Sequence, residues 1–213
     1  MKSLSTPFYL TGGTALSRHY LGHRYSDDID LFVNDDPSFG DYVARVVSAL
    51  EDGGGPMGWH MLQETFVKAP AYFQINLAGG KDFSTVLKVD LVNDIASHFG
   101  GYEENQVLGT VDGWRNILAN KLSAIFRFEP KDFADIWALA KTYRFNWNEI
   151  LAAAREKEGG LDPSLAGEVI NTIPEERLRT VKWARPVDYG AMRADLDRIA
   201  LDILAGENNS LAG

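Results

Sequence analysis

Residues 11–32 constrain this chain most, because they join a glycine turn to a strand that carries two aspartates. The apolar residues 8–10 end at Gly12 and Gly13, and the residues from Thr14 onward suit a helix. Such a turn directs backbone N–H groups at an anion, and the missing Cβ atoms let a phosphate approach the main chain. Two glycines after a strand are more often a simple turn. The phosphate interpretation therefore needs support from the residues that follow.

Asp28 and Asp30 supply that support, because they share one face of the next predicted strand. Side chains alternate along a strand, so the two aspartates point one way and Ile29 and Leu31 point the other. Neighbouring like charges repel, whereas two carboxylates that converge suit Mg2+ or Mn2+ carrying nucleotide phosphates. The alternative is an acidic strand face in contact with water.

A third carboxylate, Asp90, lies in the strongest remaining strand pattern, residues 86–92. Val89 and Leu91 belong to its apolar side, so Asp90 falls on the opposite side together with Lys88. Pairing this strand with the first would bring three acids onto one face of a sheet, as a two-metal site requires.

These motifs resemble the nucleotidyltransferase superfamily, and specifically the AbiEii/AbiGii toxin family. The resemblance rests on Gly-Gly-Thr-Ala-Leu at 12–16, on His-Arg-x-Ser-x-Asp-Ile-Asp-Leu-Phe at 23–32, and on two later motifs. These are Asn-Lys-Leu-Ser-Ala at 120–124 and Lys-Asp-Phe-Ala-Asp-Ile at 131–136. Lys131 departs from the family pattern, which has arginine there. The residues after these motifs carry no sequence motif of the family.

The later motifs add a lysine and two aspartates. Lys121 interrupts the apolar stripe of a helix that we expect to be capped by Asp112, so its ammonium must either extend to the rim or meet an anion. In the next helix, begun by Pro130, the stripe puts Asp132 at its margin and Asp135 on the side facing water. Acids are also favoured in a first turn by the helix dipole. We expect replacement of Lys121 by methionine to preserve or raise thermal stability.

The resemblance and the residues together predict a site in two groups. The catalytic group is expected to act on an NTP with Mg2+ or Mn2+, and it comprises the metal-binding acids Asp28, Asp30 and Asp90, with Lys121 and Asp132. The nucleotide-binding group comprises Gly12, Gly13, Thr14, Arg24 and Ser26. His19 and His23 have the spacing of a metal pair on a helix, but Gly22 interrupts that helix and no third nitrogen ligand is near, so we interpret them as non-ligands. Together with Arg18 and Arg24 they either neutralise phosphates at the rim of the site or lie in water.

Composition limits the partners and the compartment. The formal net charge of −9 argues against broad nucleic-acid binding, yet residues 113–145 hold six basic residues against three acidic ones, a local charge of +3. That segment is either an RNA-facing surface or an ordinary solvated helix face. No cysteine is present, which excludes disulfides and thiolate chemistry. The absence of a long apolar run or a basic leader predicts a cytoplasmic protein without a membrane span.

The predicted fold class is α+β, with a nucleotidyltransferase-type mixed sheet, covering helices and a helical C-terminal half. We expect residues 1–111 to form the sheet domain and residues 112–213 to form a helical domain that closes the active-site cleft. Strands are predicted at 59–67 and 71–77, and helices at 37–50 and 189–205.

The predicted reaction is transfer of a nucleoside monophosphate to an acceptor hydroxyl. The family resemblance implies a toxin of a toxin–antitoxin pair, makes a tRNA 3′ end the leading acceptor, and implies a cognate antitoxin protein. Two other classes share the sheet motif: a nucleotidyltransferase that modifies small molecules such as antibiotics, and a non-catalytic nucleotide-binding module. Retention of all three acids speaks against the module. The sequence leaves open the nucleotide, the acceptor, toxicity in the host and the oligomeric state. It also leaves open whether Asp132 or Asp135 is the site acid of the helical half.

Overall fold

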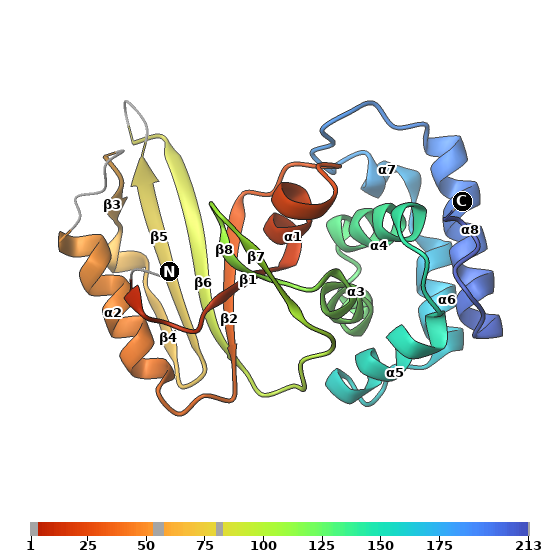
Figure 1. Cartoon of the computed structure of the whole chain (residues 1–213). Coiled ribbons are helices and arrows are strands. Elements are labelled where there is room, and N and C mark those ends of the chain that lie inside the picture. The colour runs from red at the N-terminus through yellow and green to blue at the C-terminus, as the bar shows by residue number, and fades with distance from the viewer. Residues whose placement is uncertain (1–3, 53–57, 80–82, 213) are drawn as a thin grey trace. The chain divides into compact units, whose positions relative to one another are not determined.

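The computed structural model describes residues 4–52, 58–79 and 83–212 (Figure 1). It divides into two compact units. The first contains the described residues of Met1–Ala15, Asp27–Ser97 and Tyr102–Asp112, and the second contains those of Leu16–Ser26, His98–Gly101 and Gly113–Gly213. Within the described residues, no helix has the length and apolar character needed to cross a membrane.

The first unit is built on one mixed sheet. In the described part of the chain its strands lie in the order β3-β5-β6-β2-β1-β8-β7, with β4 also beside β5. The strands are β1 (Tyr9–Thr11), β2 (Asp28–Asn34), β3 (His60–Met61), β4 (Val67–Ala69), β5 (Tyr72–Gly79), β6 (Thr85–Asp94), β7 (Tyr102–Asn105) and β8 (Gly109–Asp112). The helical segments described in this unit are α1 (Gly12–Ala15), α2 (Phe39–Asp52) and η3 (Gln63–Thr65). The mixed sheet predicted from the sequence is confirmed.

Strand pairing gives the sheet an apolar face and a polar face. β6 pairs with β2 in parallel and with β5 in antiparallel fashion, and Leu31, Leu91 and Phe73 stand side by side in that register. All three side chains are buried. Residues one position away, including Asp30 and Asp90, must therefore occupy the opposite face.

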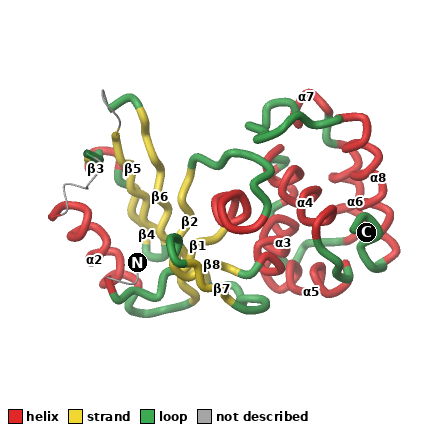
Figure 2. Tube along the Cα trace, turned by 45° about the horizontal axis from the view of Figure 1, so that its top comes forward, coloured by secondary structure: helices red, strands yellow, loops and turns green. Residues whose placement is uncertain are grey.

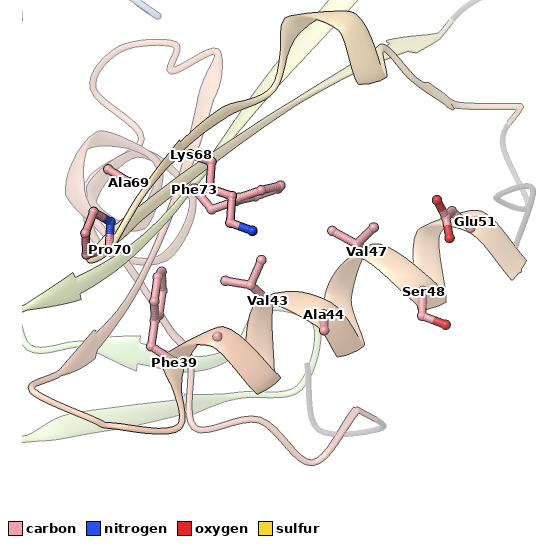
Figure 3. Close-up of a pocket in the computed structure, with 11 residues that line it drawn as sticks. Phe39, Val43, Ala44, Val47, Ser48, Glu51, Lys68, Ala69, Pro70 and Phe73 are labelled. Carbon is pink, nitrogen blue, oxygen red and sulfur yellow. The ribbon is translucent and has the colours of Figure 1, made fainter.

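Helix α2 covers the apolar face, as Figure 1 shows beside β4 and β5. Phe39 of α2 packs edge to face on Phe8, and its helix neighbour Tyr42 does the same. A groove of about 660 Å3 lies between α2 and the β4–β5 hairpin. Figure 3 shows Val43 and Val47 of α2 directed across it toward Phe73. The small residues Gly40, Ala44 and Ser48 recur every four positions along α2, which leaves this side of the helix thin.

The second unit is helical (Figure 2). Its segments are η2 (Leu16–Tyr20, a π-helix), α3 (Trp114–Ser123), η4 (Ile125–Arg127), α4 (Pro130–Thr142), α5 (Trp147–Lys157), α6 (Pro163–Thr172), α7 (Glu175–Leu178) and α8 (Tyr189–Ala205). Pro130 stands in the first turn of α4, as the sequence predicted, and Asp162 caps α6 through its side chain.

Other local predictions differ from the structure. Asp112 does not cap α3: Gly113 is the N-cap residue, and the fully buried Asp112 carboxylate accepts a hydrogen bond of 2.5 Å from the Thr11 hydroxyl. Residues 59–67 are not one strand, because η3 separates β3 from β4. Residues 102–112 form a β7–β8 hairpin that was not predicted.

Candidate active site

The glycine turn at the start of α1 is shaped by an acid on the neighbouring strand. Gly12 has a φ of +68°, a conformation that residues with a Cβ rarely adopt. A Cβ at this position would lie 2.4 Å from Asp30 Oδ2, so the Asp30 carboxylate packs directly against the turn. The Thr14 hydroxyl donates a hydrogen bond to the backbone carbonyl of Asp28, which fastens α1 to β2. Gly13 is buried in the same short helix.

The three predicted metal-binding acids occupy the polar face of the sheet. Asp30 of β2 stands opposite Asp90 of β6, and Asp28 stands opposite Lys88, two positions earlier on each strand. Asp28 keeps about a third of its side chain exposed, whereas Asp90 is largely buried. The strand alternation in the sequence therefore placed all three acids on one face.

Lys88 lies among these acids. Its Nζ is 2.8 Å from Asp90 Oδ2 and 3.9 Å from Asp28 Oδ2. Burial alone would lower the pKa of Lys88, but the hydrogen bond and charge of Asp90, with the charges of Asp28 and Asp30, raise it above its ordinary value. The ammonium is thus held in its charged form between two carboxylates.

Tyr72 of β5 completes the surroundings of Asp90. Its hydroxyl lies 2.9 Å from Asp90 Oδ1 and 3.0 Å from Gln74 Oε1. Burial, together with the hydrogen bond to Asp90, raises the pKa of Tyr72 to about 12, so the phenol stays protonated and donates. Both oxygens of Asp90 therefore have a partner.

The chemistry of these side chains fits a hard divalent cation. Carboxylate oxygens are the ligands that Mg2+ prefers, and the ammonium of Lys88 already stands in for a cation between Asp28 and Asp90. Within the ranges that the structure describes, no three acidic or histidine side chains converge tightly enough to enclose a metal ion as they stand. A cation at this face would have to share or replace the position of the Lys88 ammonium.

The helical unit holds the second predicted group. Lys121 of α3 is buried, and its Nζ is 2.6 Å from Asp132 Oδ1 and 2.9 Å from Asp135 Oδ2. Burial would lower the pKa of Lys121, yet the charges of Asp135 and Asp132 raise it. Lys121 therefore does not extend to the rim; it forms a buried ion pair with two acids of α4. Arg127 reaches the same Asp132 at 3.3 Å.

The structure places Asp135 of α4 differently from the prediction. The prediction that it faces water is wrong, because its side chain has no exposed surface. The Arg24 guanidinium donates two hydrogen bonds of 2.7 Å to the Asp135 carboxylate, and His23 Nε2 lies 2.8 Å from Asp135 Oδ1. Burial would raise the pKa of Asp135, but the charge of Lys121 and the hydrogen bonds from His23 and Arg24 hold it well below its usual range. The apolar stripe did not indicate the burial of Asp135, because the opposite side of α4 is packed as well.

The predicted residues thus fall into two groups, each within its own unit. Gly12, Gly13, Thr14 and the three acids belong to the sheet unit, and Arg24, Ser26, Lys121 and Asp132 belong to the helical unit. The sequence did not indicate Lys88 or Tyr72 as members of the first group, and for the second group it left open the choice between Asp132 and Asp135 and did not predict the contact of His23 with Asp135. For Lys88 a signal existed, since it shares a strand face with Asp90. For Tyr72 none did, because only the hairpin register brings it there.

Comparisons with known proteins identify relatives of this chain and solved structures with a similar fold. The chain is 29% identical over 163 residues to an uncharacterised protein of Aquifex aeolicus (strain VF5), which covers 74% of this chain and 69% of that protein. Among solved structures it is similar to JHP933 from Helicobacter pylori, with a TM-score of 0.61, 21% identity, and coverage of 94% of this chain and 84% of that one.

MenT4, a nucleotidyltransferase toxin from Mycobacterium tuberculosis H37Rv, also has a TM-score of 0.61, at 15% identity, and covers 92% of this chain and 75% of that one. These two likenesses concern the fold. The family model of the nucleotidyl transferase AbiEii toxin of type IV toxin–antitoxin systems matches residues 2–207. The motifs, the fold and this match agree that the chain is a nucleotidyltransferase and belongs to the AbiEii toxin family.

Proposed function

We propose that this protein uses a divalent cation, Mg2+ or Mn2+, to transfer a nucleoside monophosphate from an NTP to the 3′ end of a tRNA. The observation that carries the proposal is the row of acids on the polar sheet face, with Asp30 opposite Asp90 and packed against the Gly12 turn. A turn that accepts a phosphate beside acids that accept a cation is the combination that nucleotide chemistry needs.

Asp28, Asp30 and Asp90 would hold the cation. When bound there, it would neutralise charge on the transferred phosphoryl group and make the acceptor hydroxyl easier to deprotonate. Asp90 is the acid that we assign to the acceptor side, because Tyr72 fixes one of its oxygens while the other contacts Lys88, whose side chain is partly exposed.

The residues of the chain then have separate tasks in the transfer. The acceptor oxygen forms a bond to the α-phosphorus, the bond from that phosphorus to the bridging oxygen breaks, and pyrophosphate leaves. Asp90 favours departure of the hydroxyl proton, and the backbone N–H groups of the turn at Gly12, Gly13 and Thr14 hold the phosphates.

Lys121, Asp132, Arg24 and Ser26, which all belong to the helical unit, are proposed to take part in nucleotide binding. The cluster contains three cations, Arg24, Lys121 and Arg127, against two aspartates, so it retains a positive charge that favours an anion. Ser26 is half-buried in the loop after η2.

The family context supports the biological part of the proposal. A type IV toxin–antitoxin toxin implies a cognate antitoxin protein and action in the cytoplasm. A tRNA acceptor agrees with the exposed basic side chains Arg127, Lys131 and Arg144 in residues 113–145.

The test is incubation of the protein with each labelled NTP, Mg2+ and total RNA, followed by sizing of the labelled product. We expect label in RNA of tRNA length, removal of that label by trimming of the 3′ end, and no label when a chelator is added. Label on a small hydroxylated acceptor and none on RNA would replace the tRNA with a small molecule. No label in any fraction would contradict transfer altogether.

A further inference from the structure

Lys88 occupies the place between two acids where a bridging cation is needed. It lies on β6 directly opposite Asp28 of β2, and its Nζ contacts Asp90 at 2.8 Å while remaining 3.9 Å from Asp28. About a third of its side chain is exposed, so the ammonium has room to move off the carboxylates on its flexible stem.

The Lys88 ammonium reduces the electrostatic repulsion among the three acids. Three carboxylates on adjacent positions of two paired strands repel one another, and like charges directly across a sheet are destabilising. Lys88 reduces this repulsion when no divalent cation is bound. A cation that arrives between Asp28 and Asp90 meets a positive charge already in place, so the two compete.

Asp90 is supported in a way that allows such an exchange. Its Oδ1 accepts a hydrogen bond of 2.9 Å from Tyr72, while Lys88 engages only Oδ2. If Lys88 leaves, Tyr72 still fixes the carboxylate. Oδ2 then exchanges one cation for another without any rotation of Asp90.

We propose that Lys88 is a built-in competitor of the divalent cation, which neutralises the acids in the cation-free protein and turns to the NTP phosphates when the cation binds. This inference rests on the proposed function, namely that Asp28, Asp30 and Asp90 hold the cation. It predicts that the cation alone binds weakly, and that an NTP strengthens its binding by receiving the displaced ammonium. Lys88 is thereby a positioning residue that couples the two ligands.

The test is titration of the full chain with Mn2+, with free Mn2+ followed by electron paramagnetic resonance, with and without a non-hydrolysable NTP analogue. Replacement of Lys88 by methionine keeps the stem and removes the charge. In the absence of nucleotide, Lys88→Met should bind Mn2+ about tenfold more tightly than the wild type, because the competing charge is gone. The strengthening of Mn2+ binding by the analogue should be smaller in the variant.

Two controls and a second variant complete the experiment. Lys68→Met removes an exposed lysine from β4, which pairs with β5 and not with β6, and should leave Mn2+ binding at the wild-type value. Lys88→Arg keeps the positive charge and should not gain Mn2+ affinity. Lys88→Gln repeats the neutral change if the methionine variant does not fold, and Mn2+ should raise the melting temperature of either neutral variant more than that of the wild type.

The possible outcomes separate this inference from the function on which it rests. Wild type and neutral variants that bind Mn2+ equally well would overturn the role of Lys88 and leave the acid site intact. Weaker binding by the neutral variants would also overturn it, by making Lys88 a supporting residue. Absence of Mn2+ binding in every variant, with and without the analogue, would overturn both the acid site and the competition.

Discussion

Replacement of Lys121 by methionine tests the buried ion cluster of the helical unit. The sequence alone suggested that this change would preserve or raise stability. The structure reverses that expectation, because the Lys121 ammonium lies 2.6 Å from Asp132 and 2.9 Å from Asp135, and both carboxylates are buried. Arg24 continues to hold Asp135 after the change, but among the residues that the structure describes Asp132 keeps only the cation of Arg127, whose side chain is 66% exposed.

The magnitude follows from the loss of one partner in a buried pair. Breaking such a pair destabilises a protein by about 3 to 5 kcal/mol. At about 2 to 4 °C per kcal/mol for a chain of this size, the melting temperature should fall by roughly 6 to 20 °C. The measurement is thermal unfolding followed by circular dichroism. Adding Asp132→Asn to the variant should recover part of the loss, because it removes the uncompensated charge.

Lys141 gives the matched control. Its Nζ lies 3.0 Å from Asp195 Oδ2, but its side chain is 48% exposed, so Lys141→Met should change stability by no more than about 1 kcal/mol. A melting temperature of Lys121→Met equal to or above that of the wild type would refute the reasoning about this buried cluster.

The remaining predictions concern acid and salt. The pKa of Asp135 is held well below its ordinary value in the folded protein. Below about pH 5 the unfolded chain therefore binds more protons than the folded protein does, and the free energy of unfolding decreases as the pH is lowered. Urea titrations over this range should show a shallower fall for Asp135→Asn, and an unchanged slope would contradict the assignment. If Arg127, Lys131 and Arg144 contact RNA phosphates, replacing all three with glutamine should lower the logarithmic salt slope of RNA affinity by about 0.7 to 0.9 per lost contact. Equal slopes would remove this surface from RNA binding.

The sheet face could be predicted because its signal is local. Alternation along residues 28–33 and 86–92 fixed which side chains share a face, and the actual register adds only that Asp30 stands opposite Asp90. The last long helix was equally predictable, because an apolar stripe at helical spacing indicated residues 189–205, which are the bounds of α8 (Tyr189–Ala205).

Features that depend on distant packing could not be predicted in the same way. Residues 102–105 of β7 are polar and largely exposed, so they lack the alternation of a buried strand. The burial of Asp135 depends on Arg24 and His23, which are more than a hundred residues away in the sequence. A helical stripe shows which side of α4 is apolar, but it does not show that the other side is also covered.

Replacement of Asp30 by alanine is the critical test of the proposed acid site, because Asp30 joins the glycine turn to the row of acids. The measurement is the rate of label transfer from NTP to RNA with Mg2+, beside circular dichroism of the same samples. We expect a loss of about a hundredfold or more in rate with the fold retained. Asp41→Ala, an exposed acid on α2, should transfer at the wild-type rate. A folded Asp30→Ala protein with near wild-type turnover would contradict the account.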